Sequence, residues 1–307
     1  MSEARLLVVG GTGFIGHHLC VEAQRRGYAV TSLSTSEAAR PVPGVRYLVG
    51  DVSQSPMSDG LERELGFEYV INAGGYIDHG GFWSGGRRVV EVHLGGASNL
   101  VAACDRNVLK RFVQIGSSDE YGAAPAPQRE DRREEPISPY SFAKTAASHL
   151  FQTLWRSERF PAAVARLFLV YGPGQDEKRF LPQLISGCLQ NKRFPVSRGE
   201  QLRDFCHVDD VVNGVLAMLD APDVCGEVVN IASGIPISIA GMIERVRALV
   251  GAGEPVFGEI PYRRGESMAL YADISKAETL LGWRPQVSLD EGLQMTIDWY
   301  RRRFNAE

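Results

Sequence analysis

The chain has 307 residues, a formal net charge of -4 and 44% hydrophobic residues. This length is enough for one large domain or two smaller ones, and the composition is typical of a globular protein in water. A charge balance this close to neutral offers little attraction for nucleic acid or for an anionic membrane, and no apolar run approaches the roughly 18 residues of a membrane span. We therefore expect neither nucleic acid nor a membrane as a partner.

The use of cysteine indicates the compartment in which the protein works. The count is odd, no C-x-x-C pair occurs, and the cysteines are scattered along the chain (Cys20, Cys104, Cys188, Cys206 and Cys225). This pattern argues against a disulfide framework and against a structural metal site. The first residues lead directly into an apolar run, without the pattern of a secretory signal peptide. The sequence therefore predicts a cytoplasmic protein with no bound metal.

The amino-terminal residues are expected to form a strand, a glycine-rich turn, a helix and a second strand. Residues 6–9 are a short apolar run, typical of a parallel strand that is buried on both faces. Apolar residues recur at helical spacing over 15–26, and Gly27 ends that pattern. The second strand is expected over 29–33.

Strands and helices continue to alternate as far as Gly172. Strands are expected in the segments VRYLVGDV, YVINAG, RFVQIGSS and AAVARLFLVYG, and helices over 89–104 and 139–157. This alternation predicts an α/β fold with a doubly wound parallel sheet. Beyond Gly172, short helices are punctuated by glycine and proline. We therefore predict a dinucleotide-binding Rossmann domain over 1–171, to which 204–232 returns, and a smaller mixed α/β substrate lobe over 172–307.

The segment GGTGFIG follows the first expected strand and opens the first expected helix. It places Gly10, Gly13 and Gly16 in a G-x-x-G-x-x-G spacing. Glycines let the backbone approach a pyrophosphate closely, and the start of the helix offers N–H groups and a partial positive charge. In this context the motif strongly indicates a dinucleotide site, whereas a tight turn without a ligand is the plainer alternative.

The end of the second strand bears on the choice of dinucleotide. A carboxylate that binds the ribose is expected there, about 20 residues after the glycines, but this chain has Ser34. A hydroxyl does not repel a 2′-phosphate, and Ser34 and Arg40 could both donate hydrogen bonds to one. The sequence thus favours NADP over NAD, although a Ser34 that only caps a loop would admit either. Asp51 is placed to meet the adenine.

The segment SPYSFAK contains a candidate acid–base pair. Tyr140 and Lys144 stand four residues apart, and Ser138 and Pro139 suit the start of a helix, so both side chains should share one helix face. An ammonium beside a phenol favours the phenolate and lowers the pKa of the phenol. Such a tyrosine can exchange a proton with a sugar or alcohol oxygen. An ordinary helix face remains the alternative for so short a motif.

At this point the chain resembles the extended short-chain dehydrogenase/reductase family, whose members modify nucleotide sugars with NAD or NADP. The resemblance runs nearly from end to end, and its motifs are specific for the family and much less so for the reaction. They are GGTGFIG, GDV, SSDEYG, PYSFAK, VYGPGQ, RDFCHVDDV, NIASG and LLGWRPQVSLDEGL. The resemblance implies a nucleotide-diphosphate sugar as substrate and a homodimer formed through the helices around 89–104 and 139–157.

The resemblance also implies roles for individual residues. Ser117 would join Tyr140 and Lys144 in catalysis, and Asp119 would be a further catalytic carboxylate. Beyond the glycine turn, the cofactor would be contacted by several residues, and the substrate by others. The expected cofactor contacts are Phe14, Ile15, Val52, Asn72, Ala73, Gly74 and Asn99, and the expected substrate contacts are Ser118, Arg203 and Arg263.

Two positions are expected to select the reaction. In 4,6-dehydratases of the family the residues after the catalytic hydroxyl include a glutamate base, whereas this chain has Ser118 and the shorter Asp119. The string GSSDEYG, which lacks the usual apolar residue before the tyrosine, looks more like reductases that act at C4 of 4-keto-6-deoxy nucleotide sugars. The alternatives are a C4 epimerase or a 4,6-dehydratase with tightly bound NAD and, more remotely, a non-catalytic protein that senses the cofactor.

Two further positions qualify this resemblance. Leu169 stands where many relatives have an asparagine that contacts the sugar diphosphate, which leaves the substrate pose open. An internal salt bridge to Asp204 or Asp209 is the alternative to substrate binding for Arg203. His207 is expected to cap a helix and not to catalyse.

Overall fold

A seven-stranded parallel sheet forms the centre of the larger part of the molecule, as the sequence predicts. The structure, a computed structural model, describes residues 3–54, 66–78, 80–262 and 266–304. The strand order is β10-β6-β5-β4-β1-β2-β3. The bounds are β1 Arg5–Val9, β2 Ala29–Ser34, β3 Arg46–Val49, β4 Tyr69–Asn72, β5 Arg111–Ser117, β6 Ala162–Leu167 and β10 Val228–Ile231.

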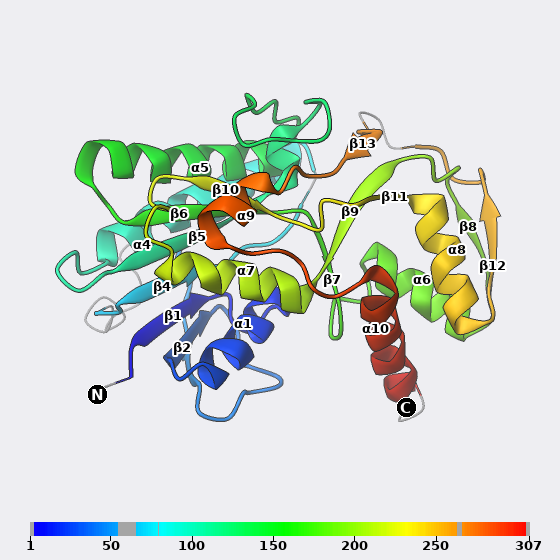
Figure 1. The fold of residues 1–307 in the computed structure, drawn as a ribbon, viewed down its shortest axis with the longest axis horizontal. Coiled ribbons are helices and arrows are strands. Elements are labelled where there is room, and N and C mark those ends of the chain that lie inside the picture. Colours follow the sequence, from blue (N-terminus) through cyan, green and yellow to red (C-terminus); the bar gives the residue numbers. More distant parts are fainter. Residues whose placement is uncertain (1–2, 55–65, 79, 263–265, 305–307) are drawn as a thin grey trace.

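Helices cover both faces of this sheet, so the strands are buried on both sides. Figure 1 shows α4 and α5 over one face and α1 and α7 over the other. The bounds are α1 Phe14–Arg25, α4 Gly96–Ala103, α5 Pro139–Glu158 and α7 Val208–Asp220. The strand order reverses between β1 and β4, and the carboxyl ends of strands at such a switch point are where open α/β sheets bind ligands.

The smaller part of the molecule combines short strands with three packed helices. Strand β9 pairs with β7, β11 and β13, and β8 pairs with β12. Helices α6, α8 and α10 bury a separate apolar cluster that includes Leu181, Met242 and Ile297. The bounds are β7 Leu169–Tyr171, α6 Phe180–Leu189, β8 Arg193–Val196, β9 Leu202–His207, β11 Pro236–Ser238, α8 Ile239–Val250, β12 Glu254–Phe257, β13 Ala269–Leu270 and α10 Leu289–Phe304. Helix α9 Ser275–Leu281 belongs to the larger part, where it lies beside β10 (Figure 1) and where Ala277 joins the main core.

The segment expected to form one strand over AAVARLFLVYG forms two strands in different sheets. Strand β6 lies in the main sheet, and β7 pairs with β9 in the second sheet. The break falls at Phe168, whose buried side chain packs in a small cluster with Tyr121 and Ala232. Apolar residues on both sides of the break concealed it from sequence reasoning. The two-domain division with its boundary near residue 171 remains a prediction, although β10 does pair with β6 in the main sheet.

Two of the three expected helices have nearly the predicted bounds, while the third is interrupted. In place of one α-helix over 89–104, the chain forms η1 Phe82–Gly86, α3 Arg87–Val90, η2 Glu91–Gly95 and then α4. The η2 segment is a π-helical turn and contains the buried His93. Such turns are rare and often occur at functional sites, and the apolar spacing alone does not reveal this one.

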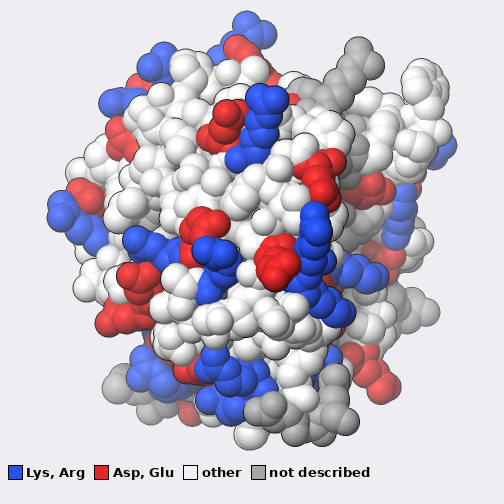
Figure 2. Space-filling model, turned by 90° about the vertical axis from the view of Figure 1, so that its right-hand side faces the viewer, with Lys and Arg blue, Asp and Glu red and all other residues white. Residues whose placement is uncertain are grey.

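The surface and the helices match an ordinary globular protein. Figure 2 shows Lys and Arg side chains interspersed with Asp and Glu over the face formed by the smaller part. Within the described residues, no helix combines the length and the apolar character needed to cross a membrane. In the same part of the chain, no group of three or more His, Cys, Asp or Glu side chains is arranged to hold a metal ion.

A substitution in the glycine turn should test how closely the first helix approaches it. A Cβ on Gly16 would overlap the backbone of Gly10, while one on Gly95 would meet no described atom within 4 Å. We expect Gly16→Ala to lower the free energy of unfolding by about 1–3 kcal/mol, because the backbone must shift. Gly95→Ala, the matched control in a helical segment, should be neutral or raise stability by about 0.5–1 kcal/mol. Chemical denaturation measures both, and equal effects would contradict this close approach.

Candidate active site

The glycine turn lies at the switch point of the main sheet, between the carboxyl ends of β1 and β4. Gly10 has a φ of 80°, and its N–H donates to the Leu33 carbonyl at 2.7 Å. A Cβ on Gly10 would lie 2.9 Å from the Ala73 carbonyl oxygen, so only glycine fits there. Gly13 begins α1 without a side-chain cap. The first N–H groups of this helix therefore point toward the turn in the way that anion-binding helices require.

A pocket of about 340 Å³ opens beside this turn. It is bordered by the glycine turn, by α1 and by α10. Its lining includes Thr12, Gly13, Phe14, His17, His18, Arg40 and Trp299. The Arg40 guanidinium lies 5.8 Å from the centre of the Trp299 ring. Arg40 therefore stacks at the mouth of the pocket, where a positive charge favours an anionic ligand.

Ser34 has a different surrounding from the one expected of a 2′-phosphate ligand. Its side chain is buried, and its hydroxyl oxygen accepts a hydrogen bond from the Thr12 N–H at 3.2 Å. Ser34 therefore braces the glycine turn, which is the loop-capping alternative that the sequence left open. A preference for NADP remains a prediction that no contact in the structure tests.

The other expected cofactor residues brace the loops around the switch point. Asn72 donates from Nδ2 to the Gln114 side chain at 2.8 Å, and its Oδ1 accepts from the Gly74 N–H. Asn99 donates to the Val52 carbonyl at 2.9 Å. Asp51 accepts from the backbone and hydroxyl of Ser53 and pairs with Arg88 at 2.9 Å. Phe14 and Ile15 are the first residues of α1, and Ala73 follows the end of β4. Contact of each of these residues with a cofactor remains a prediction.

Tyr140 and Lys144 lie at the start of α5, as the sequence predicts. Ser138 caps the helix by accepting from the Ser141 N–H. The Lys144 ammonium donates to the Ile115 carbonyl at 2.9 Å, which ties the helix to the end of β5. It lies 5.9 Å from the centre of the Tyr140 ring. The pair therefore does share one helix face beside the carboxyl end of a central strand.

The electrostatics of the pair differ from the sequence expectation. Burial raises the pKa of Tyr140, and the charge of Asp119 raises it further, while a hydrogen bond from Ser117 lowers it. Burial also lowers the pKa of Lys144 to about 8. The expectation of a lowered tyrosine pKa was therefore wrong for this structure, because the cost of burying a phenolate exceeds the effect of the neighbouring ammonium.

The residues around Ser117 form a turn that opens toward the second part of the molecule. Ser117 ends β5 and caps the short 3₁₀ helix η3, Ser118–Tyr121. Ser118 is buried, while Asp119 is half-buried. The charge of Asp119 acts on both Tyr140 and Arg203. Asp119 therefore lies close enough to both Tyr140 and Arg203 for its charge to change their pKa values.

Arg203 is held by a carboxylate that sequence reasoning did not identify. It lies on β9 and forms an ion pair with Glu266, in place of the expected alternatives Asp204 and Asp209. Asp204 instead accepts hydrogen bonds from Ser233, Gly234 and Ala272. Arg263 lies outside the described residues. A role of Arg203 in binding substrate therefore remains a prediction, whereas His207 does cap α7 by accepting from the Asp209 N–H.

Several residues near the catalytic group were not recognised in the sequence. His93 packs edge-on against the Tyr140 ring, with 5.3 Å between ring centres, and burial lowers its pKa to about 3. Arg179, at the start of α6, carries a positive charge that lowers the pKa of Tyr140. Glu120 forms a fully buried ion pair with Arg166. These contacts join distant parts of the chain, so no local motif reports them.

The fold and this site together define a class of enzyme. A glycine turn at a switch point, followed by a serine, a tyrosine and a lysine that converge beside it, is the arrangement of dinucleotide-dependent enzymes that exchange hydride and a proton. The chain belongs to the NAD dependent epimerase/dehydratase family, whose model matches residues 6–232. Its homologues are extended short-chain dehydrogenase/reductase enzymes, as the sequence predicts.

Three similar proteins indicate the range of reactions. An uncharacterized UDP-glucose epimerase of Bacillus subtilis, YtcB, is 27% identical over 99% of this chain and 100% of its own. The dTDP-glucose 4,6-dehydratase of Streptomyces antibioticus is 29% identical over 96% of this chain and 92% of its own. MoeE5, solved with NAD and either UDP-glucuronic acid or UDP-glucose, is 30% identical over 98% of this chain and 100% of its own, with a TM-score of 0.87. The chain is thus an NAD-dependent enzyme of the nucleotide-sugar epimerase/dehydratase kind.

Removal of the Tyr140 hydroxyl should abolish turnover without loss of cofactor binding. Acid–base groups commonly contribute about 10²–10⁴-fold in rate, and we expect Tyr140→Phe to lower kcat by that factor. Tyr171→Phe is the control, because that buried hydroxyl donates to the Leu289 carbonyl at 3.4 Å and no contact among the described residues links it to Tyr140. Steady-state kinetics and cofactor titration distinguish the two variants. Wild-type kcat in Tyr140→Phe would remove Tyr140 from the mechanism.

Proposed function

We propose that the protein is a nucleotide-sugar C4 epimerase that retains NAD, with a UDP-hexose as substrate. One observation carries the proposal. Ser117, Tyr140 and Lys144 converge at the carboxyl end of β5, beside a glycine turn whose helix start has no side-chain cap. That arrangement provides proton exchange with a sugar hydroxyl next to a dinucleotide site, and epimerisation at C4 needs no further acid or base.

The residues of the chain supply binding, orientation and proton transfer in this proposal. The glycine turn and the start of α1 would hold the pyrophosphate, and NAD would supply reversible hydride exchange at the sugar carbon. Tyr140 moves the proton between its phenol oxygen and the C4 oxygen, and the Ser117 hydroxyl orients that phenol. The Lys144 ammonium favours the ionised phenol, which burial disfavours.

Asp119 favours an uncharged sugar over a sugar acid. Its carboxylate acts on the Tyr140 phenol, so it lies near the position of the C4 oxygen. It also faces Arg203, which is already paired with Glu266. The carboxylate of a sugar acid would therefore enter a site that already contains the carboxylate of Asp119 beside the Arg203–Glu266 ion pair. MoeE5 has been solved with both UDP-glucose and UDP-glucuronic acid. We expect this chain to favour UDP-glucose, whose sugar has no carboxylate.

The reductase that the sequence favoured is less well supported than the epimerase. YtcB, described as a UDP-glucose epimerase, and MoeE5, solved with NAD and UDP-sugars, support an NAD enzyme that acts on UDP-sugars. The Streptomyces dehydratase keeps a 4,6-dehydratase as an alternative. Asp119 would be the base in that alternative, with its shorter side chain reaching toward C5. A homodimer through α4 and α5 and a cytoplasmic location remain predictions for each of these enzymes.

A panel of nucleotide sugars distinguishes these reactions. We expect UDP-glucose to give an isomer of unchanged mass without added cofactor, at a higher kcat/KM than UDP-glucuronate. Asp119→Asn should narrow that difference, because it removes one negative charge while it keeps the shape of the side chain. Mass spectrometry and chromatography of the products provide the measurement.

Two other outcomes of the panel would contradict the proposal. A product lighter by one water would identify a dehydratase. Oxidation of NADPH with a 4-keto-6-deoxy sugar, together with no reaction of intact hexoses, would identify the reductase.

The cofactor should be NAD. The Ser34 hydroxyl is buried and bonded to the Thr12 N–H, and Arg40 stacks on Trp299. The Ser34 oxygen thus serves the glycine turn as an acceptor, and both the family model and MoeE5 name NAD as the cofactor. We expect the purified protein to contain NAD and to bind NAD with a lower Kd than NADP, as measured by titration of the stripped protein. A lower Kd for NADP, reversed by Ser34→Asp, would instead support the preference that the sequence suggested.

A further inference from the structure

A fully buried cluster of charges lies directly beneath the catalytic group. The side chains of Glu120 and Arg166 are completely inaccessible to solvent, and their closest atoms are 2.7 Å apart. A buried ion pair loses its hydration, and replacement by apolar residues of similar volume is often neutral or stabilising. Stability alone therefore does not explain why this chain has a charged residue where apolar packing would suffice.

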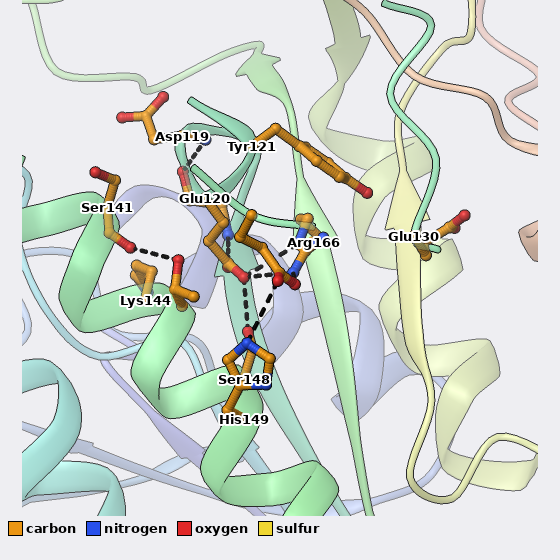
Figure 3. Close-up of polar contacts among 12 residues, drawn as sticks. Asp119, Glu120, Tyr121, Glu130, Ser141, Lys144, Ser148, His149 and Arg166 are labelled. Carbon is orange, nitrogen blue, oxygen red and sulfur yellow. Dashed lines mark hydrogen bonds and ion pairs between the residues drawn. The ribbon is translucent and has the colours of Figure 1, made fainter. Parts of the chain in front are cut away.

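The two oxygens of the Glu120 carboxylate contact three different elements. Oε1 accepts from the Ser117 N–H at 2.7 Å, at the point where β5 ends. Oε2 accepts from the Ser148 hydroxyl on α5 at 2.8 Å and from Arg166 on β6 at 2.7 and 3.1 Å. Figure 3 shows these contacts around Glu120. One carboxylate thus links the serine turn, the catalytic helix and the neighbouring strand.

The helix that Glu120 contacts is the one that carries the acid–base pair. Tyr140, Lys144 and Ser148 are each four residues apart on α5, so they lie along one face of that helix. Lys144 is bonded to the carbonyl of Ile115. The bond from Ser148 to Glu120 adds a second attachment one turn further along. The helix is therefore fixed to the serine turn at two successive positions.

The surroundings leave Glu120 little freedom to move. Arg166 is also held by Glu134 at 2.8 Å, and its guanidinium lies 4.4 Å from the centre of the Tyr121 ring. A Cβ on Gly116 would lie 2.6 Å from Glu120 Oε1, so the glycine leaves room for the carboxylate. Asp119 points away from this cluster in Figure 3. Adjacent acidic residues therefore face two different environments.

We propose that Glu120 is a positioning residue, whose carboxylate fixes the turn that carries Ser117 against the helix that carries Tyr140 and Lys144. The inference rests on the proposed function, because it assigns Glu120 to the geometry of that site. It does not require Glu120 to touch substrate or cofactor. Glu134 provides the contrast, since it shares Arg166 with Glu120 but no described contact links it to Ser117 or Ser148.

Three single substitutions test the proposal. Glu120→Gln removes the charge and keeps the shape, Glu120→Asp keeps the charge and shortens the reach, and Glu134→Gln is the matched control. A misplacement of about 1 Å at an active site can cost about 10²-fold in rate, and we expect a loss of that order in kcat for both Glu120 variants. KM for the nucleotide sugar and the Kd of the cofactor should change far less, and Glu134→Gln should retain kcat.

A double substitution separates positioning from folding. Glu120→Leu with Arg166→Met replaces the ion pair by apolar groups but also takes Arg166 from Glu134. The fraction of folded protein is therefore measured beside kcat, and kcat per folded molecule should fall as in the single variants. Wild-type kcat in either single Glu120 variant or in the double variant would overturn the proposal. The proposal would also be overturned if kcat fell only in proportion to the loss of folded protein in the three single variants and the double variant.

Hydrogen exchange provides a readout that does not depend on activity. We expect amide exchange over residues 116–121 to be faster in Glu120→Asp than in the wild type and unchanged in Glu134→Gln. If the wild-type protein converts no nucleotide sugar, the proposed function fails, and this exchange still decides whether Glu120 fixes the turn. Equal exchange rates in the wild type and Glu120→Asp would overturn the positioning inference whatever the activity.

Discussion

The carboxyl ends of β5 and β6 and the middle of α5 meet around one buried ion pair, Glu120 with Arg166. Three segments that are distant in the sequence contribute to it, and each also contributes to the site. The strand β5 ends in Ser117, the helix carries the tyrosine and the lysine, and β6 leads into the second part of the molecule. The site is therefore built where the two parts of the fold are linked, and a shift of any one segment would separate the serine from the acid–base pair.

The electrostatic balance of the site follows from this burial. The phenol and the ammonium lie against the sheet, where desolvation disfavours their charged forms and raises the pKa of Tyr140 while lowering that of Lys144. The positive charge of Arg179 and the hydrogen bond from Ser117 act against this rise in the pKa of Tyr140. Asp119 acts in the opposite sense, because its negative charge raises the pKa of Tyr140 further.

Local motifs could be predicted from the sequence, whereas contacts across the fold could not. The glycine turn and the Tyr140–Lys144 spacing are each set within one segment, and the structure places them as predicted. The position of Ser34 alone suggested a hydrogen bond to the 2′-phosphate of NADP. In the structure its hydroxyl oxygen accepts from the Thr12 N–H on a different segment, so it braces the glycine turn. Glu120 belongs to the SSDEYG motif, yet its partners Ser148 and Arg166 lie 28 and 46 residues away. Only the folded chain shows that it faces inward.

Transfer of label from C4 tests most directly the claim that this site oxidises and reduces one carbon of a nucleotide sugar. The protein would be incubated with UDP-glucose that carries deuterium at C4, without added cofactor, and the product analysed by mass spectrometry and NMR. The account predicts an isomer of unchanged mass that keeps its deuterium at C4, because the hydride leaves and returns at the same carbon. A product that is lighter by one water, with its deuterium on another carbon, would contradict it, as would the absence of any conversion.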